Sequence, residues 1–202
     1  MQVDSLAVAD AFVLTPRQFP DSRGVFMEWF SASAFSDAVG HPLDLAQANC
    51  SVSSRGTLRG VHFADVPPGQ AKYVTCATGA VLDVVFDIRV GSPTYGAHHA
   101  VLLDTVDRRA LYLPEGVGHA FLALEDNSTV MYLCSTGYNP SAEHGINPLD
   151  PALGIEWPAD IEPLLSDKDR DAPLLAEAEA SGLLPLYADC VARYAELRGQ
   201  KP

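Results

Sequence analysis

The chain has 202 residues, of which 48% are hydrophobic, and it carries a formal net charge of −13. This length and composition predict one globular domain with a sizeable core, and the acidity argues against a nucleic-acid partner, whose binding requires basic surface. The first twenty residues do not resemble a signal peptide and no apolar run approaches the length of a membrane span, so we expect a cytoplasmic protein without membrane association.

Short strands separated by turns are predicted over most of residues 10–135, a pattern typical of a β-sandwich or barrel. One short helix is expected before the main run of strands, from Ser31 to Val39. Ser31 is suited to the N-cap position, and Gly40 is suited to the left-handed residue that ends a helix.

Two of the predicted strands carry unusual polar residues. Polar residues alternate with small or apolar ones at residues 47–53, so that Gln47, Asn49, Ser51 and Ser53 share one face. Residues 81–88 are apolar on both faces except for two aspartates. Both patterns fit strands that face the wet interior of a barrel, although a polar strand face is also compatible with simple exposure to solvent.

The segment 45–82 is basic within an acidic chain, and its only charged residues are Arg55, Arg59, Asp65 and Lys72. A local basic region on an acidic body suits a small anionic ligand. His62 lies in the same segment, three residues after Arg59. A base, an ammonium and an arginine on neighbouring strands are what proton abstraction next to a carbonyl requires, because the cations hold the enolate and the substrate's anionic group.

Arg59 and His62 are an odd number of residues apart, so on a regular strand they face opposite sides. If both line one pocket, the strand must contain a bulge or kink, most simply at Gly60.

The C-terminal part of the chain changes in composition. Helices are predicted at residues 174–180 and at about 186–197, with Ser181-Gly182 and Pro185 between them. The four cysteines are far apart and form no Cys-x-x-Cys pair. We interpret them as reduced, buried, small hydrophobic residues of a cytosolic protein.

Residues 114–119, Pro-Glu-Gly-Val-Gly-His, match the second half-signature of the cupin superfamily, Pro-x-Gly-x-x-His, and His62 with Gly79 is similar to the first half. The match predicts a mainly β protein, a cupin double-sheet jelly-roll barrel with short C-terminal helices. We expect one domain over residues 1–202, with the jelly roll at about 8–165 and a helical tail at about 166–202 packed on it.

Cupins often hold a metal ion with three histidines and a glutamate, but the donor set here is incomplete. The expected His-x-His is His62-Phe63-Ala64, and Lys72 stands where a glutamate ligand would be. Two histidines without a carboxylate fall short of a facial triad, so we expect neither metal nor any other cofactor. The rival interpretation is a metal-dependent cupin oxygenase.

A longer set of motifs occurs in one order along residues 8–185. It includes Asp21-Ser22-Arg23-Gly24-Val25-Phe26, Gln47-Ala48-Asn49-Cys50-Ser51, Leu58-Arg59-Gly60-Val61-His62, Gly118-His119-Ala120-Phe121, Tyr138-Asn139-Pro140 and Leu165-Ser166-Asp167-Lys168-Asp169. This ordered set resembles the dTDP-4-dehydrorhamnose 3,5-epimerase family, metal-free cupins that act on dTDP-linked 4-keto-6-deoxyhexoses.

The resemblance implies roles for residues that match the family pattern. His62 would be the base, Asp169 its orienting partner, Tyr132 the acid on the opposite face, and Lys72 the group that stabilises the enolate. Other matching positions would bind the substrate: Arg23, Glu28, Gln47, Asn49, Arg59, His119, Tyr138, Glu143 and Lys168. The arginines suit diphosphate, and Tyr138 would stack on thymine. Arg23 and Glu28 would come from the partner subunit of a homodimer that exchanges N-terminal strands.

The resemblance therefore implies an isomerase that inverts C3 and C5 of dTDP-4-dehydro-6-deoxy-D-glucose to give dTDP-4-dehydro-L-rhamnose. A related alternative is an epimerase acting at C3 or C5 alone, because Ala120 stands where the commoner family pattern has glycine. A third interpretation is a module that binds a nucleotide sugar without turnover.

Residue patterns alone also permit plainer interpretations of several site residues. His62 and Tyr132 are flanked by apolar residues and could belong to the core, while His119 could cap a turn. Asp169 and Lys168 lie in a charged run that is typical of a solvated surface.

Overall fold

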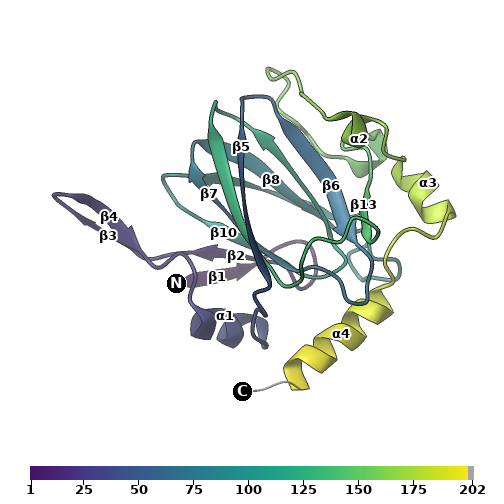
Figure 1. Ribbon diagram of the computed structural model, residues 1–202, viewed down its shortest axis with the longest axis horizontal. Helices are drawn as coiled ribbons and strands as arrows, with labels where there is room; N and C mark the ends of the chain where they lie inside the picture. Colours follow the sequence, from purple (N-terminus) through teal and green to yellow (C-terminus); the bar gives the residue numbers. More distant parts are fainter. Residues whose placement is uncertain (200–202) are drawn as a thin grey trace.

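The computed structural model describes residues 1–199, and its strands form two facing antiparallel sheets and one separate hairpin (Figure 1). The first sheet has the order β1 (Gln2–Ser5), β2 (Phe12–Thr15), β10 (Ala110–Leu113), β7 (Lys72–Thr78), β12 (Ser128–Cys134) and β5 (Gln47–Ser53). The second has the order β13 (Glu143–Gly145), β6 (Leu58–Ala64), β11 (Gly118–Ala123), β8 (Ala80–Phe86) and β9 (His98–Asp104). The mainly β jelly-roll prediction is confirmed.

The main core lies between the two sheets. Val74, Leu111 and Val130 of the first sheet pack with Val85 and Phe121 of the second, and all five side chains are buried. Alternation along each strand directs these residues inward, so apolar side chains fill the space between the two sheets. The two sheets remain apart at their edges, where β5 lies near β13 and β6 on one side, and β1 lies near β9 on the other.

The helix α1 (Ala32–Val39) has the bounds that the sequence predicts. Gly40 follows it with a left-handed φ of 90° and donates its N–H to the Ser36 carbonyl. Ser31 is the N-cap residue but makes no side-chain capping bond. Phe35 and Val39 bury the apolar face of α1 against Tyr73 and Tyr112 of the first sheet.

The C-terminal segment contains a 3-10 turn (Pro151–Leu153) and the helices α2 (Asp167–Arg170), α3 (Leu175–Ala180) and α4 (Tyr187–Gly199). The two longer helices agree with the sequence, whereas α2 is not predicted because four residues give too short a periodic pattern. The described residues, 1–199, include no helix long and apolar enough to cross a membrane.

A buried arginine anchors α4 on the barrel. Arg89 is fully buried and donates to both oxygens of Asp87 at 2.9 and 2.8 Å, and to the Tyr194 hydroxyl at 3.2 Å. Tyr194 in turn donates to the Glu115 carbonyl at 2.8 Å. These contacts fix α4 against the loop before β11.

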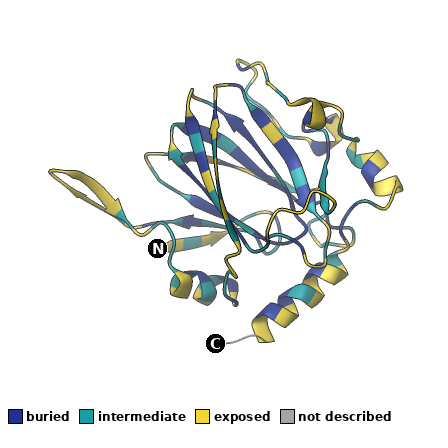
Figure 2. Ribbon diagram, viewed as in Figure 1, coloured by how far each residue is buried: buried dark blue, intermediate teal, exposed yellow. Residues whose placement is uncertain are grey.

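The hairpin of β3 (Gln18–Asp21) and β4 (Gly24–Met27) projects away from the barrel (Figure 1). Figure 2 shows that nearly all of it is exposed, and Phe26 retains 67% of its accessible surface. Phe19 on β3 pairs with Phe26 on β4, so exposed apolar side chains lie on both strands of a hairpin that would be only marginally stable in water by itself.

The interpretation of all four cysteines as buried is wrong for one of them. Cys76, Cys134 and Cys190 are buried and free, but Cys50 is exposed. The reason is the inverted alternation of β5, where the polar residues Gln47 and Asn49 point inward and the small or apolar ones point outward.

Candidate active site

A pocket of about 220 Å³ lies where the edge of the first sheet approaches the edge of the second. It combines residues from strands far apart in sequence with residues from two loops and from α2. The lining residues are Gln47, Asn49, His62, Gln70, Lys72, Tyr132, Tyr138, Glu143 and Lys168. All of these except Gln70 are among the site residues that the sequence singles out.

The inward polar face of β5 forms one wall of this pocket. The Gln47 amide donates to Asn49 Oδ1 at 2.8 Å, and Gln47 Oε1 accepts the backbone N–H of Tyr138 at 2.9 Å. The second bond fixes the loop that presents the exposed Tyr138 ring at the mouth of the pocket. The interior-facing interpretation of this strand is therefore correct.

Gly60 produces the predicted bulge in β6. His62 pairs with His119, and Arg59 pairs with Phe121. The two paired positions are therefore three residues apart on β6 but only two residues apart on β11, which is the register shift of a bulge. Gly60 has a φ of 117°, and a Cβ there would lie 2.4 Å from the His119 carbonyl oxygen, so only glycine fits. Arg59 does not line the pocket itself; its Nε donates to the Ser53 hydroxyl at 3.3 Å, beside the pocket.

His62 is held by a carboxylate from α2. Its Nε2 lies 2.6 Å from Asp169 Oδ1, and only 6% of Asp169 is exposed. Burial acts to raise the pKa of Asp169, but the His62 bond and charge, the Ser166 hydroxyl and Lys168 together hold that pKa below its usual value. The interpretation of Asp169 as part of a solvated run is wrong, because α2 turns this one side chain inward while its neighbours face solvent.

Lys72 and Tyr132 face the same pocket from neighbouring strands. Burial lowers the pKa of the Lys72 ammonium, while Glu143, Cys134 and Asp83 act in the opposite direction. Burial raises the pKa of the Tyr132 phenol, assisted by Cys134 and Glu143 and opposed by Arg59. The phenol therefore stays neutral and able to donate a proton at physiological pH.

A second imidazole–carboxylate pair lies deeper in the barrel. His119 Nε2 is 2.9 Å from each oxygen of Asp83, which is fully buried. His119 is therefore not a turn cap, and it does not line the pocket. The sequence alone does not identify Asp83 as the partner of His119, although a carboxylate in an apolar strand is a usable signal, because buried charges are normally paired.

Ala120 is buried in a second cluster behind the pocket, and its φ is not in the left-handed region. An alanine at this position therefore introduces no backbone strain.

Arg23 and Glu28 lie on or beside the projecting hairpin, away from the pocket of their own chain (Figure 1). The Arg23 side chain is 88% exposed and pairs with Asp21. Within residues 1–199, no three histidine, cysteine, aspartate or glutamate side chains gather as a set that could hold a metal ion.

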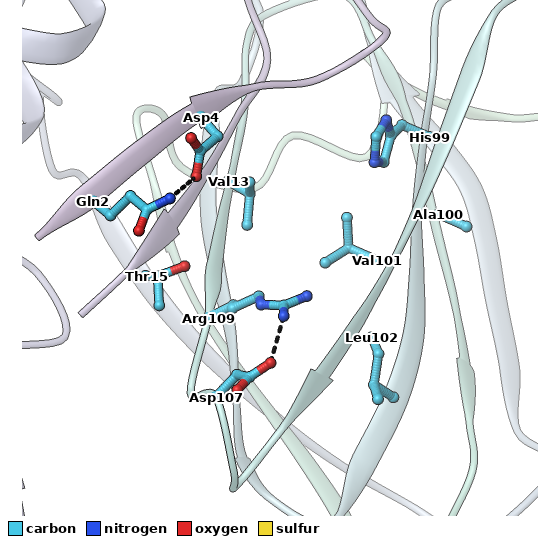
Figure 3. Close-up of a pocket in the computed structure, with 10 residues that line it drawn as sticks. All are labelled: Gln2, Asp4, Val13, Thr15, His99, Ala100, Val101, Leu102, Asp107 and Arg109. Atoms are coloured by element: carbon cyan, nitrogen blue, oxygen red, sulfur yellow. Dashed lines mark hydrogen bonds and ion pairs between the residues drawn. The ribbon is translucent and has the colours of Figure 1, made fainter. Parts of the chain in front are cut away.

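The opposite opening of the barrel holds a larger cleft of about 430 Å³, between β1–β2 and β9 (Figure 3). Its polar groups bond to near neighbours, Gln2 to Asp4 and Arg109 to Asp107. Only one histidine, His99, lines it, and that ring accepts the backbone N–H of Ala7. This cleft lacks the paired imidazole and carboxylate of the smaller pocket.

The fold and the smaller pocket, which His62, Lys72 and Tyr132 line together, are those of a jelly-roll isomerase. The family model described as dTDP-4-dehydrorhamnose 3,5-epimerase matches residues 5–177. The chain therefore belongs to the dTDP-4-dehydrorhamnose 3,5-epimerase family, and it is an epimerase.

Individual relatives agree with this assignment. A dTDP-4-dehydrorhamnose 3,5-epimerase of Mycolicibacterium smegmatis is 60% identical over 98% of both chains. The solved structure of the Mycobacterium tuberculosis rmlC epimerase matches with a TM-score of 0.95 and 52% identity, covering 98% of this chain and 100% of the other. ChmJ of Streptomyces bikiniensis, described as a 3'-monoepimerase in complex with dTDP-quinovose, matches with a TM-score of 0.94 and 50% identity over 96% and 98%.

Proposed function

We propose that this chain inverts C3 and C5 of dTDP-4-dehydro-6-deoxy-D-glucose, giving dTDP-4-dehydro-L-rhamnose. The observation that carries the proposal is that His62, Lys72 and Tyr132 line one pocket. C3 and C5 both neighbour the C4 ketone, so the same carbonyl acidifies the proton on each. One base and one acid on opposite faces of the ring can then invert either centre without redox chemistry, a metal or a cofactor.

His62 is the base in this mechanism, through its Nδ1 atom. The Asp169 carboxylate accepts a 2.6 Å hydrogen bond from the Nε2–H of His62, which leaves the lone pair on Nδ1. As the α proton moves to Nδ1, the C–H electron pair forms the enolate, and Asp169 stabilises the imidazolium that results. General base catalysis of this kind is worth about 10² to 10⁴ in rate.

Lys72 and Tyr132 complete the reaction. The Lys72 ammonium stabilises the enolate oxygen, and its partial burial strengthens that interaction. Tyr132 then delivers its phenolic proton to the opposite face of the same carbon, and both side chains exchange protons with solvent before the next event. The raised pKa of the phenol keeps its proton in place until the enolate forms.

The nucleotide is bound at the mouth of the pocket. Tyr138 is exposed there and suits stacking on the thymine ring, and Lys168, which lines the same pocket, pairs with the diphosphate with the help of Arg59. Gln47, Asn49 and Glu143 provide polar contacts along the sugar, and His119 supports the floor from behind.

The working unit is a homodimer that exchanges its hairpins, so that Arg23 and Glu28 complete the partner's site. Two features support this arrangement. The hairpin exposes Phe26, and the outer face of the first sheet exposes Val52 at 61% together with Met131 and Cys50. Two apolar surfaces on one small chain are typical of a self-complementary interface.

Complementation between inactive variants tests the exchange. Arg23→Ala and His62→Ala should each be inactive alone, but mixed subunits should regain about a quarter of wild-type activity, because half of the random dimers hold one intact site in two. Sites built from a single chain would regain none. The buried free cysteines accord with a reducing compartment, and we place the enzyme in the cytoplasm.

An epimerase of one centre only is the second candidate, because a 3'-monoepimerase is 50% identical to this chain. Incubation with dTDP-4-keto-6-deoxyglucose in heavy water separates the two. Deuterium at both C3 and C5, with inversion of both, is the expected result. Label at one carbon alone would replace the double-inversion proposal with the single-centre one, and label at neither would remove the function.

A further inference from the structure

Both oxygens of Asp169 are occupied, and by different partners. Oδ1 lies 2.6 Å from His62 Nε2, while Oδ2 accepts the hydroxyl proton of Ser166 at 2.9 Å. The Asp169 backbone N–H also donates to the same Ser166 oxygen, at 3.1 Å. Ser166 therefore donates to the side chain and accepts from the backbone of the residue that orients the base.

We infer that Ser166 is a positioning residue that completes a Ser166–Asp169–His62 relay and locks the tautomer of His62 that exposes Nδ1 as the base. The inference rests on the proposed function, since it assigns Ser166 through the base. It also goes further, because Ser166 does not line the pocket and acts only through Asp169.

The geometry explains why a hydroxyl is needed here. A carboxylate bound through one oxygen can turn about its Cβ–Cγ bond, which would weaken the hydrogen bond to the imidazole. The Ser166 bond fixes the second oxygen and so sets the plane of the carboxylate. Only 6% of Asp169 is exposed, so in the folded protein its carboxylate oxygens depend mainly on protein donors for their hydrogen bonds.

The short helix α2 adds a link to the nucleotide end of the pocket. It begins after Ser166 and carries Lys168, which lines the pocket, directly before Asp169. The Ser166 N-cap therefore holds a helix that presents two groups. One is Lys168, a candidate ligand of the diphosphate, and the other is the Asp169 carboxylate that bonds to His62. The other charged groups that line the pocket with His62 are Lys72 from β7 and Glu143 from β13.

A purely structural role for Ser166 makes a different prediction. An N-cap serine only needs an oxygen that accepts a backbone N–H, and glycine replaces it at little cost to stability whereas alanine costs more. The relay requires a donor to Asp169 Oδ2, which alanine and glycine both lack and threonine retains. Ser166→Ala, Ser166→Gly and Ser166→Thr therefore separate the two roles.

The test measures kcat and KM for the three variants with dTDP-4-keto-6-deoxyglucose. Alanine and glycine should both lower kcat about tenfold with KM unchanged, while threonine restores it, since one charge-assisted hydrogen bond is worth roughly that factor.

Nitrogen NMR of the histidine side chains gives a readout that needs no substrate. His62 should have its proton on Nε2 in the wild-type protein and a mixture of tautomers in Ser166→Ala. An alanine variant with wild-type kcat and a wild-type His62 tautomer would overturn the inference, as would a glycine variant that behaves like wild type. If instead the wild-type protein does not turn over the sugar nucleotide, the proposed function fails, and the NMR result still decides the role of Ser166.

Discussion

Replacement of Asp169 by asparagine removes the negative charge beside His62 but keeps the size and shape of the side chain. In the wild-type protein Ser166 donates to Oδ2, and Oδ1 accepts the Nε2 proton of His62. In Asp169→Asn the same serine donor favours the amide carbonyl at the Oδ2 position, which turns the NH₂ toward His62. The imidazole must then accept at Nε2 and carry its proton on Nδ1, the atom assigned to the substrate.

The size of the effect follows from that reversal. A wrong tautomer in a Ser-His-Asp triad costs about 10⁴ in kcat. Some asparagine side chains will adopt the opposite orientation at the expense of the Ser166 bond, so we expect a decrease in kcat of about 10³, or about 4 kcal/mol. Binding of dTDP should not change, because Asp169 lies behind His62 and does not line the pocket.

The assay is steady-state epimerisation followed by NMR, with dTDP affinity measured by calorimetry. Asp167→Asn is the matched control, because Asp167 lies on the same helix with its side chain 90% exposed and pairs only with Arg170. The control should retain wild-type activity. An Asp169→Asn enzyme within tenfold of wild type would refute the tautomer argument.

Three further predictions concern the oxyanion, the bulge and acid stability. Lys72→Met should lower kcat about 10² to 10³ with little change in dTDP affinity, because it removes the cation at the enolate oxygen but keeps the side-chain volume; an unchanged kcat would exclude Lys72 from that role. Gly60→Ala should reduce the free energy of unfolding by about 2–4 kcal/mol, since it adds left-handed backbone strain and a clash with the His119 carbonyl. Denaturant titration measures this loss, and a loss under about 1 kcal/mol would show that β6 relaxes easily. Burial acts to raise the pKa of Asp87, but bonds from Arg89, Ser92 and Thr94 outweigh it and hold that pKa below the usual value. Its ionised form therefore stabilises the fold above the ordinary aspartate pKa, and this contribution is lost as pH falls through the folded-state pKa, so Asp87→Asn should flatten the acid side of the stability curve; an equally steep acid loss in the variant would contradict the assignment.

The sequence predicts local structure where one residue has a specific steric role. Gly40 ends α1 in the left-handed conformation, and Gly60 supplies the bulge that an odd spacing between Arg59 and His62 requires. The alternation on β5 also predicts a shared polar face, because period two is a property of any strand. What the pattern could not decide is which side of the sheet that face occupies, since this depends on the opposing sheet.

The least predictable parts of the site are those made by tertiary contacts. Asp169 lies in a charged run, and only the short helix α2 turns it inward to His62. Asp83 reaches His119 across neighbouring strands, and no local pattern links these two residues. Tyr132 is flanked by apolar residues and is half-buried like a core tyrosine, so its access to the pocket becomes visible only in the folded chain.

The proposed mechanism requires His62 and Tyr132 to act on opposite faces of one enolate. The decisive measurement is solvent deuterium incorporation by Tyr132→Phe, compared with His62→Ala. We expect Tyr132→Phe to exchange the α protons but to return them with retained configuration, because His62 removes and restores each proton on one face. His62→Ala should neither exchange nor invert. Inversion by Tyr132→Phe at the wild-type rate, or exchange by His62→Ala at the wild-type rate, would rule out this division of roles.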